Sequence, residues 1–302
     1  MEFRQLQYTV QIALERSFSR AAEKLHIAQP SLSQQIAKLE KEIDIILFQR
    51  STSHVELTQA GELFVKKSQV ILDLVEQLKQ EMEDISQIKK GRLVVGSMPM
   101  TGATILPRVV PAFQTAYPEI EITLIEETSS HLETITSQGQ TDISLLSLPL
   151  RVNGLNYEVL LQEEIVLAVP PHHPLAQSQN AISLAMLAQE AFISLKKGLG
   201  FQQLTLDLCI EAGFMPQIVF ESSNMETIQS LVAAGMGIAF VPYFIAERND
   251  SSYAPVYLQI DTRPTRTLVM AYKKGRYMSK AAEAFMQTMK KVADALSTTR
   301  NR

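Results

Sequence analysis

The sequence predicts three structural parts in series: a helix-turn-helix unit with a small wing, one long helix, and an α/β domain. Three short helical patterns fill about the first 45 residues, and an uninterrupted helical pattern runs from Gln59 to about Lys89. Strand-like and helical runs then alternate along the rest of the chain. With 302 residues, 46% of them hydrophobic, the chain has the length of about two domains.

The N-terminal helices are marked by the residues at their starts. Residues 2–16 place apolar side chains on one side of a first helix. Ser19 is a suitable N-cap for a short second helix, and Pro30 suits the first turn of a third. The segment "ILFQRSTSHVELT" then predicts two short strands around a Ser-Thr-Ser turn. An ordinary three-helix packing unit with a hairpin is the alternative.

The third predicted helix has one buried stripe and one polar face. The stripe follows the helical period at Leu32, Ile36, Leu39 and Ile43. The opposite face carries Ser31, Gln34, Gln35 and Lys38. Small hydroxyls, amides and a lysine suit contact with a partner that offers hydrogen-bond groups and phosphates.

The long helix carries a narrow apolar seam, which favours pairing with a second helix. Spacings of four and three alternate over three heptads, through Phe64, Ser68, Ile71, Val75, Leu78, Met82 and Ile85. The alternative is a helix that lies along its own domain.

The α/β domain is predicted from the alternation of strand-like and helical segments. We expect parallel strands covered by helices, near residues 92–97, 120–126, 142–147, 163–169, 191–195, 217–221, 238–241 and 265–272. Alternation alone leaves open whether they form one sheet or two lobes.

Composition argues against several classes of protein. The single cysteine, Cys209, cannot form an internal disulfide, and the five histidines show no metal-ligand spacing. The sequence contains no phosphate-binding loop, nucleophile elbow or catalytic triad, so we expect neither an enzyme nor a cofactor. We find no signal peptide and no apolar stretch of about 18 residues, and therefore expect a cytoplasmic protein without a membrane partner. Net charge is −4, and residues 1–90 hold 12 Lys plus Arg against 13 Asp plus Glu, so any DNA affinity must depend on charge placement.

The stretch "FSRAAEKLHIAQPSLSQQIAKLEKEIDIILFQRSTSHVELTQAG" closely resembles the winged helix-turn-helix of LysR-type transcriptional regulators. The resemblance implies a DNA-binding domain at 1–58, a linker and dimerisation helix at 59–90, and a periplasmic-binding-protein-like effector-binding domain at 91–302. It further implies lobe I at 91–162 with 267–302 and lobe II at 163–266, joined by crossovers near "LLQEEIV" and "RPTRTLV".

The expected function is effector-modulated transcription regulation in bacteria. The expected partners are double-stranded DNA with pseudo-palindromic sites, further copies in a homotetramer, and RNA polymerase if the protein activates. A cytoplasmic solute-binding or enzymatic protein whose helical N-terminus does not bind DNA is the alternative.

Two positions depart from the family pattern. Asp44 stands where a glycine usually ends the third helix, and aspartate can adopt the left-handed cap at modest cost. Gln34 stands where an arginine is usual, which changes the expected base preference because glutamine tends to pair with adenine.

The DNA-binding residues are expected on the polar face of the third helix and in the wing. They are Gln29, Pro30, Ser31, Ser33, Gln34, Lys38, Arg50, Ser53 and His54. For Arg50 a surface ion pair is an equal alternative to a phosphate contact, and Ser53 and His54 could be solvated turn residues.

The effector is expected between the lobes, beyond the carboxyl ends of strands. Candidate contacts are Ser97, Met98, Met100, Thr101, Thr128, Ser129, Phe201 and Gln202, and "ESSNMET" adds a predicted capping box from Ser223 to Glu226. Each hydroxyl could instead be only a helix cap. Helix N-termini near Lys196 and Lys197 favour a small organic acid or an amino-acid-like metabolite.

Overall fold

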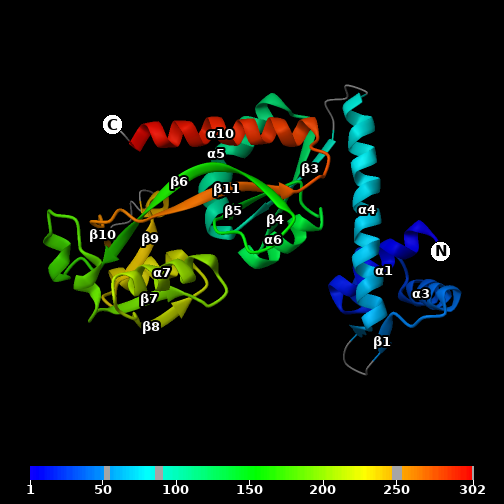
Figure 1. The fold of residues 1–302 in the computed structure, drawn as a ribbon, viewed down its shortest axis with the longest axis horizontal. Coiled ribbons are helices and arrows are strands. Elements are labelled where there is room, and N and C mark those ends of the chain that lie inside the picture. Colours follow the sequence, from blue (N-terminus) through cyan, green and yellow to red (C-terminus); the bar gives the residue numbers. More distant parts are fainter. Residues whose placement is uncertain (51–54, 86–90, 247–253, 301–302) are drawn as a thin grey trace. The chain divides into compact units, whose positions relative to one another are not determined.

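The computed structural model describes residues 1–50, 55–85, 91–246 and 254–300. The chain divides into two compact units, Met1–Ser86 and Gln87–Arg302. Each is described separately, and Figure 1 labels the elements for which it has room.

The first unit is a three-helix bundle with a hairpin and a long helix. Its elements are α1 (Phe3–Glu15), α2 (Phe18–Lys24), α3 (Gln29–Ile43), β1 (Phe48–Arg50), β2 (Val55–Leu57) and α4 (Gln59–Ile85). The predicted stripe of α3 is buried as expected, with Leu32, Ile36 and Leu39 fully enclosed. They pack with Ile12 of α1 and Phe48 of β1 into one core. The strands β1 and β2 pair antiparallel and form the predicted hairpin.

Two helix ends in this unit test the capping predictions. Asp44 adopts the left-handed conformation, with φ 53° and ψ 37°, as expected of an aspartate in a glycine position. The N-cap prediction for the second helix was wrong. Ser17 rather than Ser19 accepts the backbone N–H of Arg20, because the helix already begins at Phe18.

The apolar stripe that α4 leaves exposed differs in part from the predicted seam. Phe64 packs against the core of the three-helix bundle and Ser68 is buried, so neither is available to a partner helix. The large apolar side chains that remain exposed are Leu63, Val70, Ile71, Leu74, Leu78 and Met82. The stripe is displaced at its start because the first turns of α4 also serve the bundle.

The second unit is built on two sheets of described strands. A seven-stranded sheet has the order β10-β6-β11-β5-β3-β4, with β9 also paired to β6. Its strands are β3 (Gly91–Ser97), β4 (Ile120–Glu126), β5 (Ile143–Ser147), β6 (Leu155–Val169), β9 (Ala239–Pro242), β10 (Val256–Leu258) and β11 (Thr265–Lys273). The strands β7 (Ala191–Leu195) and β8 (Gln217–Ser222) form a separate parallel pair.

The expectation of parallel strands was only partly right. The strands β3, β4 and β5 run parallel, but β6 pairs antiparallel with β9, β10 and β11. The strand expected at 163–169 begins earlier, at Leu155. Antiparallel neighbours distant in sequence leave no local pattern, so alternation along the chain could not identify them.

Helices cover both faces of the sheet around β3, β5 and β11. They are α5 (Pro99–Ala116), α6 (Ser129–Ser137) and α10 (Lys280–Arg300). Leu268 and Met270 of β11 face the core shared with α5 and α10. Val269 and Ala271 face the opposite core, which α6 completes. This alternation with a period of two is the signature of a strand buried on both sides.

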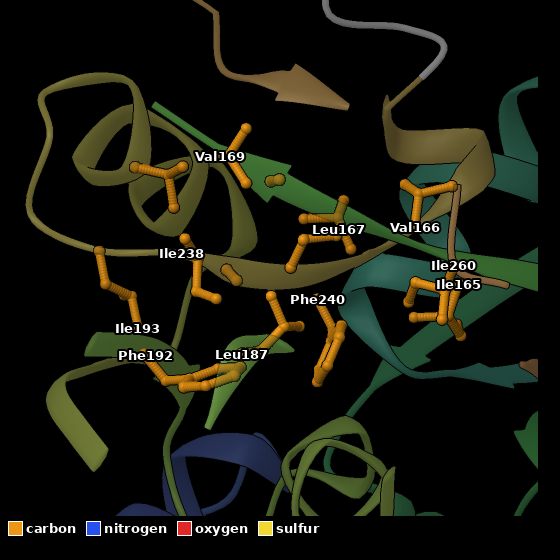
Figure 2. Close-up of a cluster of buried hydrophobic side chains, with 14 of the residues drawn as sticks. Ile165, Val166, Leu167, Val169, Leu187, Phe192, Ile193, Ile238, Phe240 and Ile260 are labelled. Atoms are coloured by element: carbon orange, nitrogen blue, oxygen red, sulfur yellow. The ribbon is translucent and has the colours of Figure 1, made fainter. Parts of the chain in front are cut away.

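The C-terminal half of β6 enters a second core. Ile165, Leu167 and Val169 pack there with Phe192 of β7 and Phe240 of β9, as Figure 2 shows. The helices of this part are α7 (Gly200–Glu211), α8 (Met225–Ala233), α9 (Tyr243–Ala246), η1 (Pro174–Gln177) and η2 (Leu184–Leu187).

A buried ion pair joins β6 and β11 where β6 passes from one core to the other. Arg266 lies opposite Glu163 in the antiparallel ladder. Its Nε and Nη2 donate to Oε2 of Glu163 at 2.7 and 2.5 Å, and Oε1 of Glu163 accepts the N–H of Phe244 at 3.2 Å. Both charged side chains are nearly inaccessible to water. Such a pair is costly to break because either charge alone would remain buried.

We therefore expect Arg266→Ala to lower the free energy of unfolding by about 3–5 kcal/mol. Urea denaturation followed by circular dichroism measures the change. The control is Lys290→Ala, which removes the half-exposed pair between Lys290 of α10 and Glu158 of β6 and should cost under about 1 kcal/mol. Equal losses in the two variants would show that burial of Glu163 is not what makes its partner important.

Candidate functional site

The polar face of α3 is presented to solvent. Five of the six predicted α3 residues are exposed, and Ser33 is half-buried: the exposed ones are Gln29, Pro30, Ser31, Gln34 and Lys38. The side-chain amide of Gln29 donates to Oγ of Ser33 at 2.9 Å, which orders the first turn. Gln35 turns inward instead, since its side chain accepts from Gln5 of α1. The arrangement offers amides and hydroxyls along one exposed side of a helix, the form that enters a major groove.

Three cations near α3 are paired with carboxylates at the two ends of α1. Nζ of Lys38 lies 3.0 Å from Oε1 of Glu2, the residue before α1. Hydrogen bonding to Lys38, reinforced by its charge, holds the pKa of Glu2 below its usual value. At the other end of α1, Glu15 pairs with Lys24 at 2.8 Å and with Arg20 at 3.7 Å. Hydrogen bonding to Lys24 is the main reason that the pKa of Glu15 is also lowered.

Part of the predicted wing site cannot be placed. Arg50 ends β1, but its side chain, together with Ser53 and His54, lies outside what the structure describes.

Three helices of the second unit begin without a side-chain cap. The N-cap residues are Met98 for α5, Thr128 for α6 and Leu199 for α7, and none of their side chains accepts a backbone N–H of its helix. By contrast, the side chain of Asn224 caps α8 by accepting from Glu226 and Thr227. Uncapped first turns retain backbone donors and the positive end of the helix dipole, which favour an anion.

The uncapped starts of α6 and α7 lie next to each other. A Cβ at Gly200, the first residue of α7, would lie 3.7 Å from Cβ of Ser129, the first residue of α6. Met100, in the first turn of α5, packs against the core that contains Phe201 of α7. The predicted contacts from the two halves of this unit are therefore brought to one region.

Thr101 in the first turn of α5 is the most distinctive side chain in this region. It is inaccessible to water, and among the described residues nothing forms a hydrogen bond with its Oγ1. A buried hydroxyl without a partner is rare in folded proteins and costs about 1–3 kcal/mol. This cost would be removed by a ligand that offers an acceptor or a donor.

The hydroxyl of Ser97, unlike that of Thr101, already has a hydrogen-bond partner within the protein. Its Oγ donates to the carbonyl of Met98 at 3.1 Å and lies 2.9 Å from where a Cβ of Gly102 would be. Any larger residue at Gly102 would displace Ser97 from the turn between β3 and α5. Met98 itself packs beside α6 in the core of that face.

The remaining predicted contacts fall into two groups. Thr128 and Ser129 are half-buried, and Oγ1 of Thr128 lies 3.5 Å from Oγ of Ser130. Phe201 and Gln202 are buried, and the guanidinium of Arg266 lies 5.6 Å from the centre of the Phe201 ring. The buried Glu163–Arg266 pair thus lies beside the first turn of α7.

The segment "ESSNMET" was interpreted wrongly. Asn224, rather than Ser223, is the N-cap of α8, and Oγ of Ser222 accepts the N–H of Asn224 at 3.1 Å. These groups satisfy each other within the turn.

Glu126 is a neighbour of the site that sequence reasoning missed. It ends β4 opposite Ser97 in the parallel ladder, and its Oε1 lies 3.3 Å from where a Cβ of Gly102 would be. The sequence did offer one signal, the position of Glu126 at the carboxyl end of a predicted strand. That signal could be used only once the pairing of β4 with β3 was known.

Cys209 is enclosed in the second core rather than placed in this region. It belongs to α7, is inaccessible to water, and burial raises the pKa of its thiol to about 12. In the part of the chain that the structure describes, no three His, Cys, Asp or Glu side chains gather as a metal site requires. No described helix has the length and apolar composition needed to cross a bilayer.

Comparison with known proteins gives matches over nearly the whole chain. Residues 3–62 match the model of the bacterial regulatory helix-turn-helix proteins of the lysR family, and residues 86–294 match the LysR substrate binding domain. The chain is 40% identical to the uncharacterized HTH-type transcriptional regulator YcgK of Bacillus subtilis, over 95% of this chain and 93% of that protein. It is 30% identical to the hydrogen peroxide-inducible genes activator of Haemophilus influenzae, over 98% and 100%. Among solved structures, full-length OxyR of Pseudomonas aeruginosa superposes with a TM-score of 0.76 at 26% identity, covering 96% and 94%.

We expect the thiol of Cys209 to be nearly inert in the folded protein. With a pKa of about 12 rather than 9.0, it holds roughly a thousandfold less thiolate near pH 8 than an ordinary cysteine does. Iodoacetamide labelling followed by mass spectrometry should modify the urea-unfolded chain quickly and the native chain only slowly. Ionisation of the unfolded thiol should also lower stability as pH rises from about 9 towards 12. Fast native labelling would contradict the buried placement of this residue.

Proposed function

Because the chain belongs to the LysR family of bacterial transcriptional regulators, which bind DNA through a helix-turn-helix domain, we propose that it reads its sites with the exposed face of α3. The observation that carries this assignment is the separation of α3 into a fully buried stripe and an exposed row of Gln29, Ser31, Gln34 and Lys38. Glutamine and serine can contact base edges, whereas Lys38 would hold a phosphate. Arg50, Ser53 and His54 of the wing are proposed as further DNA contacts.

The effector-binding domain is proposed to hold a small organic acid or an amino-acid-like metabolite where α5, α6 and α7 begin. Three uncapped helix N-termini and the buried hydroxyl of Thr101 support an anionic group there. Met98, Met100 and Phe201 add apolar surface beside it. The proposed lobes are 91–162 with 267–302 and 163–266, so the effector would contact both and bias their relative orientation.

The assembly is proposed to be a dimer through α4 and a homotetramer of two such dimers. Pairing of α4 with a second copy is supported by its exposed stripe of Leu63, Val70, Ile71, Leu74, Leu78 and Met82. A two-fold pair would present two α3 helices to a pseudo-palindromic site. We further propose a cytoplasmic location, and contact with RNA polymerase if the protein activates transcription.

We do not propose thiol-based peroxide sensing, although several relatives are named hydrogen peroxide-inducible genes activators. A thiol responds to peroxide as a thiolate and needs access, and a second thiol completes a disulfide. This chain has one cysteine, which is buried with a raised pKa. Reversible binding of a metabolite is the response that the site supports.

Gln34→Ala tests the assignment of the α3 face. It should cost about 1–3 kcal/mol of binding at one base position and relax the preference there. Selection of bound fragments from the source genome would first supply the site, and binding to single-base variants of that site measures the change. A uniform loss on every sequence would exclude a base contact at Gln34.

Thr101→Val tests the effector site. A thermal-shift screen of small organic acids and amino acids would identify a ligand, which at 100 times its Kd should stabilise the fold by about 2.7 kcal/mol. The valine should abolish most of this gain while leaving the ligand-free stability equal or higher, because it removes an unpartnered buried hydroxyl.

The matched control is Thr104→Val, one turn further along α5. The hydroxyl of Thr104 already donates to the carbonyl of Met100 at 3.0 Å, so this change should leave the ligand-dependent shift intact. A shift that survives in the Thr101 variant would place the effector elsewhere.

A further inference from the structure

Lys38, a lysine on the exposed face of α3, is held by a carboxylate outside that helix. Glu2 precedes α1, and Gln5 fixes its backbone by accepting the Glu2 N–H at 2.8 Å. The ammonium of Lys38 and Oε1 of Glu2 are 3.0 Å apart, and the two side chains are 60% and 58% exposed. An exposed pair of this kind is weak, so it can exchange partners readily.

The same pattern recurs at the other end of α1, where Glu15 holds Arg20 and Lys24 of the second helix. Residues 1–90 carry 12 basic and 13 acidic residues, so the region has no excess of positive charge to offer DNA. Each cation that leaves its carboxylate for a phosphate therefore leaves a negative charge close to the DNA.

We propose that Glu2 competes with DNA phosphates for Lys38 and so limits the affinity of this protein for DNA of any sequence. The inference rests on the proposed DNA-binding surface. Glu2 is a positioning residue in this role, since it acts on DNA only through Lys38.

The salt dependence of binding distinguishes this role from a structural one. A lysine that neutralises a phosphate normally releases about one bound counterion, which steepens the dependence of affinity on salt. When Lys38 leaves Glu2, the freed carboxylate stays near the DNA and offsets much of the charge of the lysine, so the net counterion release is smaller. The carboxylate also remains about 5–6 Å from the phosphate, where repulsion in water weakens binding about threefold.

The experiment compares the full-length protein with Glu2→Gln on a duplex of random sequence of about 30 base pairs. Fluorescence anisotropy is measured in potassium chloride between about 50 and 200 mM. We expect the variant to bind about threefold more tightly near 0.1 M salt. The slope of log Kd against the logarithm of the salt concentration should be larger by about 0.9. Glutamine keeps the length of the side chain and the Gln5 contact to the backbone, so the melting temperature should change little.

Three further variants make the result decisive. Glu62→Gln, in the exposed first turn of α4, makes the same change in net charge and should leave both quantities unaltered. Lys38→Ala should weaken binding, and it should flatten the salt dependence most clearly in the Glu2→Gln background. In the Lys38→Ala background, Glu2→Gln should have a smaller effect, because only the direct repulsion between the carboxylate and the DNA is left to remove.

Failure of the proposed competition can be distinguished from failure of the proposed DNA-binding surface. If Lys38→Ala weakens binding but Glu2→Gln does not strengthen it, the competition is overturned and the DNA-binding surface stands. Equal effects of Glu2→Gln and Glu62→Gln would overturn it in favour of net charge alone. A Lys38→Ala variant that binds like the wild type would overturn the phosphate contact and with it the inference.

Discussion

The effector-binding domain depends on one long antiparallel ladder, in which β6 and β11 pair from Leu155 to Glu164 with a single shift of register between Leu268 and Val269. Beyond that point β6 pairs with β9 and β10 and supplies side chains to a second core. The Glu163–Arg266 pair lies where this change occurs, with both charges buried and held by hydrogen bonds. A buried pair of this geometry fixes the register of the two strands, because a slip of one residue would separate the charges and leave both unpaired.

The proposed effector site is a consequence of this ladder. α5 and α6 follow strands on one side of the Glu163–Arg266 pair, and α7 follows a strand on the other side, so their first turns meet only because β6 and β11 are continuous. Arg266 also contacts the ring of Phe201 in the first turn of α7. The strands that join the two halves are thus in physical contact with the residues proposed to bind a metabolite, which gives a short route from ligand to interlobe geometry.

In the DNA-binding domain the important constraint is that α3 has one face in the core and the opposite face in solvent. Burial of Leu32, Ile36 and Leu39 fixes the rotation of α3 about its axis, and that rotation alone exposes Gln34 and Lys38. The start of α4 is shared with this core, which is why its exposed apolar stripe is displaced from the simplest heptad pattern. Core packing therefore determines both the proposed base-reading face and the proposed dimer stripe.

The sequence by itself determined the features that depend on neighbours a few residues away. These include the rotation of α3, the left-handed end at Asp44, and the alternation of strands and helices that predicted the parallel strands β3, β4 and β5. Periodicity and capping chemistry are local, so a single sequence displays them. The tertiary structure alone decided which distant groups meet. It paired Lys38 with Glu2 and Glu163 with Arg266, made Ser97 structural, left Thr101 without a partner, and enclosed Cys209, because each outcome depends on elements brought together from far apart in the chain.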